Sequence, residues 1–194
     1  MKKQKSFAAS LGLVALVTAA LLAIPLVAMA ITNEVNWSLY DFLFAGILIF
    51  GAGALYVFIR RQSESMMYRI ASGLALLSAL FLIWSNLAVG IIGSEDNVAN
   101  YMYFGVVLIL IIGVALSRFR PQGMALALFS TALAQGSTIL FALAAGMHRY
   151  SGSSIQEIIM VNGFFIVLFT TSGVLFWLES NAQKTDEISQ SDKI

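Results

Sequence analysis

The stretch of residues 84–105, WSNLAVGIIGSEDNVANYMYFG, decides the fold that the sequence predicts. Its acidic centre, SEDN, separates two apolar segments, of which the first extends back to about residue 70 and the second begins at Tyr101. A helix needs about 20 predominantly apolar residues to cross a bilayer. The stretch is therefore typical of two membrane-spanning helices joined by a short polar turn, around which the other apolar segments are organised.

The composition of the whole chain is that of a membrane protein. Of the 194 residues, 59% are hydrophobic and only 11% are charged, whereas roughly a quarter of the residues in soluble domains are charged. The mean hydropathy is +0.87. A chain of this length accommodates five or six spanning helices and leaves no room for a separate soluble domain.

We predict an all-α fold, a polytopic transmembrane bundle of six helices with short loops. Residues 1–178 would form a single domain, and the polar tail 179–194 is predicted to be disordered. Pro121 ends the fourth apolar segment, because proline cannot continue the helical hydrogen bonds. The six helices are expected at about residues 7–31, 39–59, 70–93, 101–117, 123–147 and 157–178.

The first apolar run has two interpretations. Lysines precede it and Ala28-Met29-Ala30 has the small-residue pattern of a cleavage site, so the run would be a signal peptide removed after Ala30. Its apolar length of about 25 residues exceeds the roughly 7–15 of a signal-peptide core and suffices to span a bilayer. We therefore favour a retained helix over a cleaved one.

The basic residues indicate the orientation, because cytoplasmic loops carry an excess of Lys and Arg. In a six-span topology Arg149 lies alone on one side, and Tyr101 and Tyr103 lie at the membrane boundary of that side. We therefore expect both termini in the cytoplasm and the chain in the cytoplasmic (inner) membrane of a bacterium. The other ten basic residues share the opposite side: Lys2, Lys3, Lys5, Arg60, Arg61, Arg69, Arg118, Arg120, Lys184 and Lys193.

Several function classes are disfavoured by the residues that the chain lacks. It has no cysteine and one histidine, His148, which excludes thiolate metal sites, iron–sulfur clusters and bis-histidine haem ligation within one chain. No glycine-rich phosphate loop or HExxH motif occurs, and the net charge of +1 provides no basic excess for nucleic acid. We expect no enzyme activity, no catalytic residue, no cofactor, no metal site and no nucleic-acid partner.

Amide side chains within the predicted spans form a candidate polar site. No Asp, Glu, Lys or Arg lies at mid-membrane depth, which disfavours ion-coupled carriers. Asn86, Gln135 and Asn162 form either an outward-open polar pocket or hydrogen bonds between packed helices, and we favour the second interpretation. Helical spacing groups further residues on common faces: Asn86 with Gly90 and Gly93, and Gln135 with Thr131 and Thr138.

The acidic turn is a second candidate site. Glu95 and Asp96, with Asn97 and Asn100, offer the carboxylate and amide oxygens that Ca²⁺ and Mg²⁺ prefer. However, Asn100 is a suitable N-cap for the following helix, and two carboxylates alone lack the oxygen count of an ion cage. Glu95 and Asp96 therefore stay candidate site residues without a predicted metal.

The acidic residues near two other helix starts fit capping boxes. Ser38 and Asp41, and likewise Ser154 and Glu157, have the Ser-x-x-acid spacing in which serine and acid bond the free backbone amides of a helix start. This spacing accounts for Asp41 and Glu157 without a ligand.

Four pieces of the chain resemble a widespread, uncharacterised group of small six-span bacterial inner-membrane proteins. The pieces are residues 36–46 (NWSLYDFLFAG), 84–100 (WSNLAVGIIGSEDNVAN), 118–135 (RFRPQGMALALFSTALAQ) and 161–165 (VNGFF), and the SEDN turn is the most specific part. The resemblance covers most of residues 25–178. It implies six spans with the first helix retained, and it implies no activity and no catalytic residue.

Two functions are consistent with this sequence. We expect a non-enzymatic accessory or structural membrane component, which acts in the lipid bilayer by packing with itself or with another membrane protein. The alternative is a small transporter or channel for a neutral solute or a cation, built on the amides and the acidic turn. A water-accessible cavity around Asn86, Gln135 and Asn162 would favour the alternative, and a dry helix contact would favour the first function.

Overall fold

A computed structural model describes residues 7–191, and these residues form helices and connections without a strand. The predicted all-α fold is therefore confirmed for the described part of the chain. Six of its helices are long and apolar enough to cross a membrane, which makes this a multi-pass membrane protein. Four lysines that entered the orientation count lie outside the described residues: Lys2, Lys3, Lys5 and Lys193.

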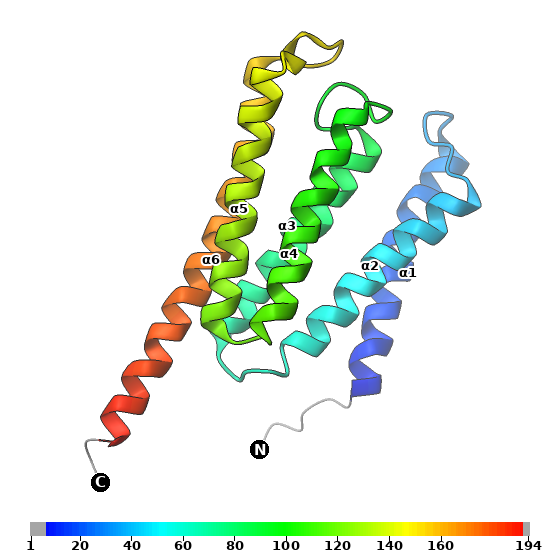
Figure 1. Ribbon diagram of the computed structural model, residues 1–194. Coiled ribbons are helices and arrows are strands. Elements are labelled where there is room, and N and C mark those ends of the chain that lie inside the picture. Colours follow the sequence, from blue (N-terminus) through cyan, green and yellow to red (C-terminus); the bar gives the residue numbers. More distant parts are fainter. Residues whose placement is uncertain (1–6, 192–194) are drawn as a thin grey trace. The chain divides into compact units, whose positions relative to one another are not determined.

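The long helices follow one another along the chain with short connections (Figure 1). A 3₁₀ helix, η1 (Val98–Tyr101), precedes α4 and completes the fourth span, and a second, η2 (Met147–Arg149), follows α5. The long helices are α1 (Phe7–Ile31), α2 (Leu39–Ile59), α3 (Met66–Ala88), α4 (Met102–Ser117), α5 (Pro121–Ala144) and α6 (Ile155–Ser191).

Backbone contacts divide the chain into two compact units, Met1–Arg61 and Gln62–Ile194, where the sequence predicted a single domain. The first unit contains α1 and α2, which contact each other. The second contains α3 to α6, in which α5 packs against α4 and α6, and α3 packs against α6. Hydropathy identifies the spans but does not indicate which helix faces meet, so the division was not visible in the sequence.

In the first unit, two glycines of α2 allow α1 to approach closely. A Cβ atom at Gly53 would lie 2.6 Å from Val14 Cγ1, and one at Gly46 would lie 3.4 Å from Leu22 Cδ1. The connection to α2 ends in the predicted capping box, in which Ser38 N donates to Asp41 Oδ2 at 2.7 Å and Asp41 N donates to Ser38 Oγ at 3.4 Å. Capping, rather than ligand binding, accounts for Asp41.

Polar contacts between distant segments stabilise one end of the second unit. The basic residues predict that this end is cytoplasmic. Tyr68 is buried against Phe176, and its hydroxyl donates to the Phe119 carbonyl at 2.8 Å. Arg118 and Phe119 adopt left-handed backbone conformations with φ of 49° and 60° in the turn between α4 and α5. A hydrogen bond to a buried tyrosine thus stabilises a turn that contains no glycine at these two positions.

Helix α6 continues to Ser191, whereas the sequence predicted a helix ending at residue 178 and a disordered tail. Glu179 is buried at the start of the extension, where its carboxylate accepts hydrogen bonds from Ser65 Oγ at 2.5 Å and from Gln183 Nε2 at 2.7 Å. Hydropathy locates the end of the apolar run, not the end of the helical hydrogen bonds. Residues 192–194 of the predicted tail lie outside the described part.

The turn between α3 and α4 differs most from the prediction. Helix α3 ends at Ala88 rather than near residue 93, and the chain then passes through Gly90 and Gly93 with φ of 77° and 70°. Left-handed backbone conformations suit glycine because it has no Cβ. The apolar residues Ile91 and Ile92 are therefore buried in a folded turn and not in the last turn of a helix.

The Asn100 side chain holds this turn together. Its Oδ1 accepts hydrogen bonds from the backbone amides of Ile91 at 3.0 Å and Ile92 at 2.9 Å, and its Nδ2 donates to the Ser94 carbonyl at 2.8 Å. The expected role of Asn100 as the N-cap of the next helix is wrong, because Asn97 caps η1 and α4 has no side-chain cap. The backbone amides that follow the end of α3 have no helical hydrogen-bond partner, and the Asn100 side chain provides one.

We predict that Asn100→Ala destabilises the second unit by about 2–6 kcal/mol, since two buried backbone amides lose their acceptor at about 1–3 kcal/mol each. Amide hydrogen exchange should accelerate at Ile91 and Ile92. Asn97→Ala, which removes only the η1 cap, is the matched control and should cost about 1 kcal/mol without exposing these amides. Unchanged protection of both amides in Asn100→Ala would contradict the assigned role.

Candidate functional site

The structure brings together two of the five predicted site residues. Gln135 on α5 and Asn162 on α6 are both 0% exposed and contact each other directly. Asn86 on α3 is buried as well, but no hydrogen bond joins it to this pair within the described residues. Glu95 and Asp96 are exposed on the turn between α3 and α4. The predicted site therefore separates into a buried pair, a buried amide and an exposed acidic turn.

The buried pair is part of a cluster of polar side chains, which we call the amide cluster and define as Tyr103, Gln135, Thr138 and Asn162. Gln135 Nε2 donates to Asn162 Oδ1 at 2.8 Å, and Thr138 Oγ1 donates to the same oxygen at 3.1 Å. Asn162 Nδ2 donates to the carbonyl of Ile158 at 2.8 Å. The first two bonds connect α5 to α6 and the third lies within α6, and all three are buried in the helix packing, as expected for a dry contact.

Tyr103 belongs to the cluster although the sequence placed it at the membrane boundary. It is 1% exposed, whereas its neighbour Tyr101 is 67% exposed. The Tyr103 hydroxyl lies beside Asn162 and Thr138, but it makes no hydrogen bond of acceptable geometry in the described chain. No local signal distinguishes the two tyrosines, because only the rotation of α4 against α5 and α6 decides which one faces inward.

Helical spacing predicted one of the two polar faces correctly. Thr131, Gln135 and Thr138 are all buried on α5, although the Thr131 hydroxyl bonds the carbonyl of Ala127 at 2.8 Å and does not reach Asn162. The common face expected for Asn86, Gly90 and Gly93 does not exist, because α3 ends at Ala88.

Five buried side-chain atoms have no hydrogen-bond partner among the described residues, and three of them belong to the predicted site residues or to the amide cluster: Asn86 Oδ1, Tyr103 Oη and Gln135 Oε1. Leaving a buried polar atom without a partner costs about 1–3 kcal/mol. The side chains of the amide cluster carry amide and hydroxyl groups only, so the cluster offers hydrogen bonding to a neutral molecule and contains no carboxylate, amine or imidazole. Its chemistry is that of helix packing or of a small neutral guest.

The acidic turn provides fewer ligand atoms than its sequence suggests. Asn97 Oδ1 accepts from the backbone amide of Ala99 at 3.0 Å, and Asn100 is engaged within the turn. Only the carboxylates of Glu95 and Asp96 are left to face solvent. No group of three or more His, Cys, Asp or Glu side chains in the described chain is placed to hold a metal ion.

No family model, curated protein or solved structure matches the chain. The interpretation of the amide cluster therefore rests on its geometry. Hydrogen bonds between polar side chains of packed spanning helices contribute on average about 0.6 kcal/mol each. The cluster has the arrangement expected of such contacts.

The two partners of the buried pair should respond differently to substitution. We predict that Gln135→Leu changes the free energy of unfolding in mixed micelles by no more than about 1 kcal/mol, because Asn162 Oδ1 keeps its bond from Thr138. Asn162→Leu should cost about 2 kcal/mol, since it leaves the Gln135 amide buried without a partner.

Both variants should still insert into the membrane, because the helices remain apolar enough to span. A complete loss of folded Gln135→Leu protein, or an Asn162→Leu variant as stable as the original, would contradict the asymmetry of this contact.

We predict that a double variant, Glu95→Gln with Asp96→Asn, has the same melting temperature as the original protein with or without Ca²⁺. Two exposed carboxylates do not form a cage of six to eight oxygens. A melting temperature that Ca²⁺ raises only in the original protein would show that the acidic turn binds the ion.

Proposed function

We propose that this chain is a non-enzymatic accessory or structural component of a bacterial cytoplasmic membrane, which acts by packing with itself or with another membrane protein. The observation that supports this function best is the amide cluster. Gln135 and Asn162, the polar residues that would line a solute path, are fully buried and bonded to each other. Side chains used in this way hold helices together and are not displayed to a passing solute.

The first unit supports a role in association. Of the described residues of α1, only Ser10 and Thr18 are buried, and a Cβ atom at Gly12 would meet nothing within 4 Å. Gly51 on α2 is equally open. In lipid, helices associate through close packing of small residues, because the bilayer is as apolar as their side chains. The hairpin of α1 and α2 therefore has surface to offer a partner helix.

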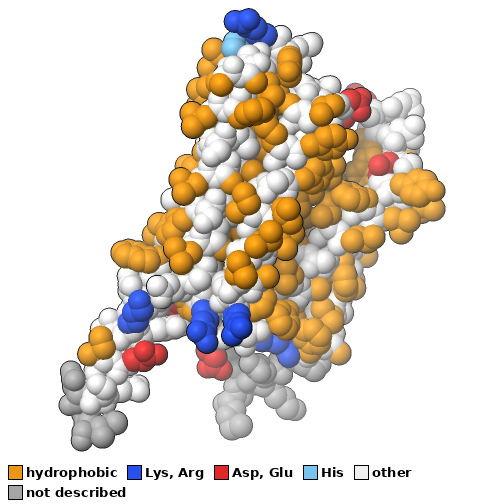
Figure 2. Space-filling model, viewed as in Figure 1, with side chains coloured by type: hydrophobic (Ala, Val, Ile, Leu, Met, Phe, Trp, Pro, Cys, Tyr) orange, Lys and Arg blue, Asp and Glu red, His pale blue; other side chains and the backbone are white. Residues whose placement is uncertain are grey.

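The distribution of charge supports a bilayer position with both termini in the cytoplasm. On the face that Figure 2 shows, hydrophobic side chains cover the helices along their length, and charged side chains lie toward the helix ends. Arg60 and Arg61 follow α2, and Arg118 and Arg120 lie between α4 and α5, on the side that the positive-inside rule makes cytoplasmic. The close contact of α1 with Gly53 supports retention of the first helix.

A transporter or channel for a neutral solute or a cation is the alternative function. The observation that favours it is that Tyr103 Oη and Gln135 Oε1 in the amide cluster are buried without a partner, as Asn86 Oδ1 is elsewhere in the unit, and such atoms would suit a small hydrogen-bonding guest. A carrier of this kind would have to separate the Gln135–Asn162 bond during transport.

Association is tested by native mass spectrometry of the chain extracted gently from its own membrane. We expect a complex of defined stoichiometry with a second copy or another membrane protein, which Gly12→Leu weakens several-fold by filling the open face of α1. Leu13→Phe is the control, because it adds bulk about 100° away around the helix. A protein that stays monomeric, or an effect of equal size in the control, would contradict the proposal.

Transport is tested in parallel by reconstitution into liposomes, in which glycerol-driven swelling and K⁺ flux are measured. If the proposed function is right, swelling and K⁺ flux in vesicles that contain the protein are no faster than in protein-free vesicles. Flux above that background, altered by Gln135→Leu, would replace the accessory function by the alternative.

A further inference from the structure

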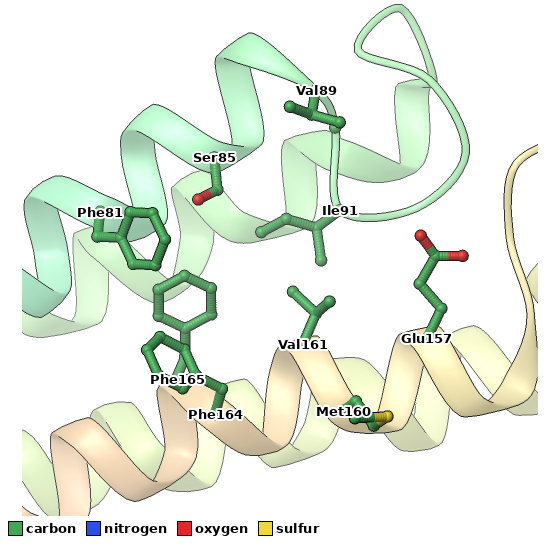
Figure 3. A pocket seen from close by; sticks show the side chains of 10 residues that line it. Phe81, Ser85, Val89, Ile91, Glu157, Met160, Val161, Phe164 and Phe165 are labelled. Atoms are coloured by element: carbon green, nitrogen blue, oxygen red, sulfur yellow. The ribbon is translucent and has the colours of Figure 1, made fainter.

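An apolar groove of about 390 Å³ runs between α3 and α6 of the second unit (Figure 3). Phe81 of α3 packs against Phe164 and Phe165 of α6, with ring centroids 5.9 and 5.6 Å apart, and these rings form the membrane end of the groove. The connection that follows α3 contributes Ile91. A groove of this volume is within the roughly 300–1,000 Å³ range of small-molecule sites.

Glu157 is the one ionisable side chain that lines the groove. Figure 3 shows it rising from α6 at one end, with the aromatic rings at the other. The capping box predicted at this helix start forms only in part: Glu157 N donates to Ser154 Oγ at 3.1 Å, but no hydrogen bond or ion pair within residues 7–191 engages the Glu157 carboxylate. Asp41 differs, because its carboxylate bonds Ser38. The Glu157 carboxylate is thus available at the mouth of the groove.

Ser85 supplies a second polar group without a partner in the described chain. The hydroxyls of Ser72 and Ser78 in the same helix donate to the carbonyls four residues before them, at 2.8 and 2.6 Å. Ser85 makes no such bond, and Figure 3 shows its hydroxyl on the groove side of α3. Serine in a helix usually bonds its own backbone, so a hydroxyl turned to an apolar groove is available to donate to a ligand.

The spacing of these groups matches the depth profile of a phospholipid. Helix α6 begins at Ile155, so Glu157 lies in its first turn at the membrane surface. At a rise of 1.5 Å per residue, Phe164 lies about 10 Å deeper along α6. The groove therefore has a carboxylate at headgroup level, a hydroxyl donor further along its wall and an aromatic, apolar end within the hydrocarbon region.

We propose that the α3–α6 groove binds one phosphatidylethanolamine, whose primary ammonium group pairs with Glu157 and whose acyl chain lies against Phe81, Phe164 and Phe165. An ammonium group has three N–H donors and forms short, charge-assisted hydrogen bonds with a carboxylate. A phosphatidylglycerol headgroup is anionic and is repelled by the same carboxylate, and a phosphatidylcholine headgroup has no N–H to donate. Ser85 donates to an ester carbonyl of the bound lipid.

The test is native mass spectrometry of the delipidated full chain, supplied with equal amounts of phosphatidylethanolamine and phosphatidylglycerol that carry identical acyl chains. We expect one phosphatidylethanolamine to be retained in preference to phosphatidylglycerol. Glu157→Gln should lower this preference roughly three- to tenfold, the range of one charge-assisted hydrogen bond at a partly exposed site. Glu95→Gln removes an exposed carboxylate outside the groove and should leave the preference unchanged.

A second variant separates the headgroup contact from the groove. Ser85→Phe fills the groove and should abolish retention of both lipids, and unchanged melting of each variant shows that it is folded. Equal retention of the two lipids by the original protein, or a Glu157→Gln variant with full preference, would overturn the proposal. A spectrum in which the protein is bound to a second copy or to another membrane protein and retains no lipid would also overturn the proposal.

Discussion

The hydrogen bonds of Asn100 are the interaction on which the connection between α3 and α4 depends. A backbone that leaves a helix near the membrane must find new hydrogen-bond partners, because lipid provides none. Asn100 supplies them for Ile91, Ile92 and Ser94, and this allows α3 to end at Ala88 and the two isoleucines to be buried. Gly93 N in turn donates to Ser153 Oγ at 2.8 Å, which connects this turn to the segment preceding α6. The turn is therefore tied by hydrogen bonds both within itself and to the segment that precedes α6.

The turn between α3 and α4 also shapes the groove between α3 and α6. Gly90 and Ile91 line the groove because the chain leaves the helix before them, and Glu157 faces them from the start of α6. A Cβ atom at Gly90 would lie 2.6 Å from the Ser94 carbonyl oxygen, so the close turn requires glycine there. A local backbone requirement thus shapes the wall of the groove that faces Glu157.

Polar contacts with α6 recur at several depths of the second unit. Toward the start of α6 Asn162 bonds Gln135, further along Ser172 donates to the Ala71 carbonyl at 2.8 Å, and beyond the apolar segment Glu179 accepts from Ser65. Each contact joins α6 to another segment of the unit. Such bonds fix the rotation and the axial position of one helix relative to its neighbour. Contacts between apolar side chains fix these less well, because lipid is equally apolar. These hydrogen bonds hold α6 to the other helices of the second unit along its length.

The sequence by itself determined that the chain is helical and membrane-spanning, because hydropathy and apolar length reflect the bilayer directly. It also determined the bounds of α1 and α2 and the Ser38–Asp41 cap, which depend on neighbouring residues alone. The tertiary structure decided the end of α3, the role of Asn100, the burial of Tyr103 and the length of α6. The Asn100 hydrogen bonds connect residues up to nine positions apart, but they form only once the turn has folded. Glu179 at the start of the α6 extension bonds Ser65, which is far away in the chain, and the rotation that brings Gln135 to Asn162 leaves no local pattern. Lipid solvates all faces of a helix nearly equally, so only packing decides which polar groups meet.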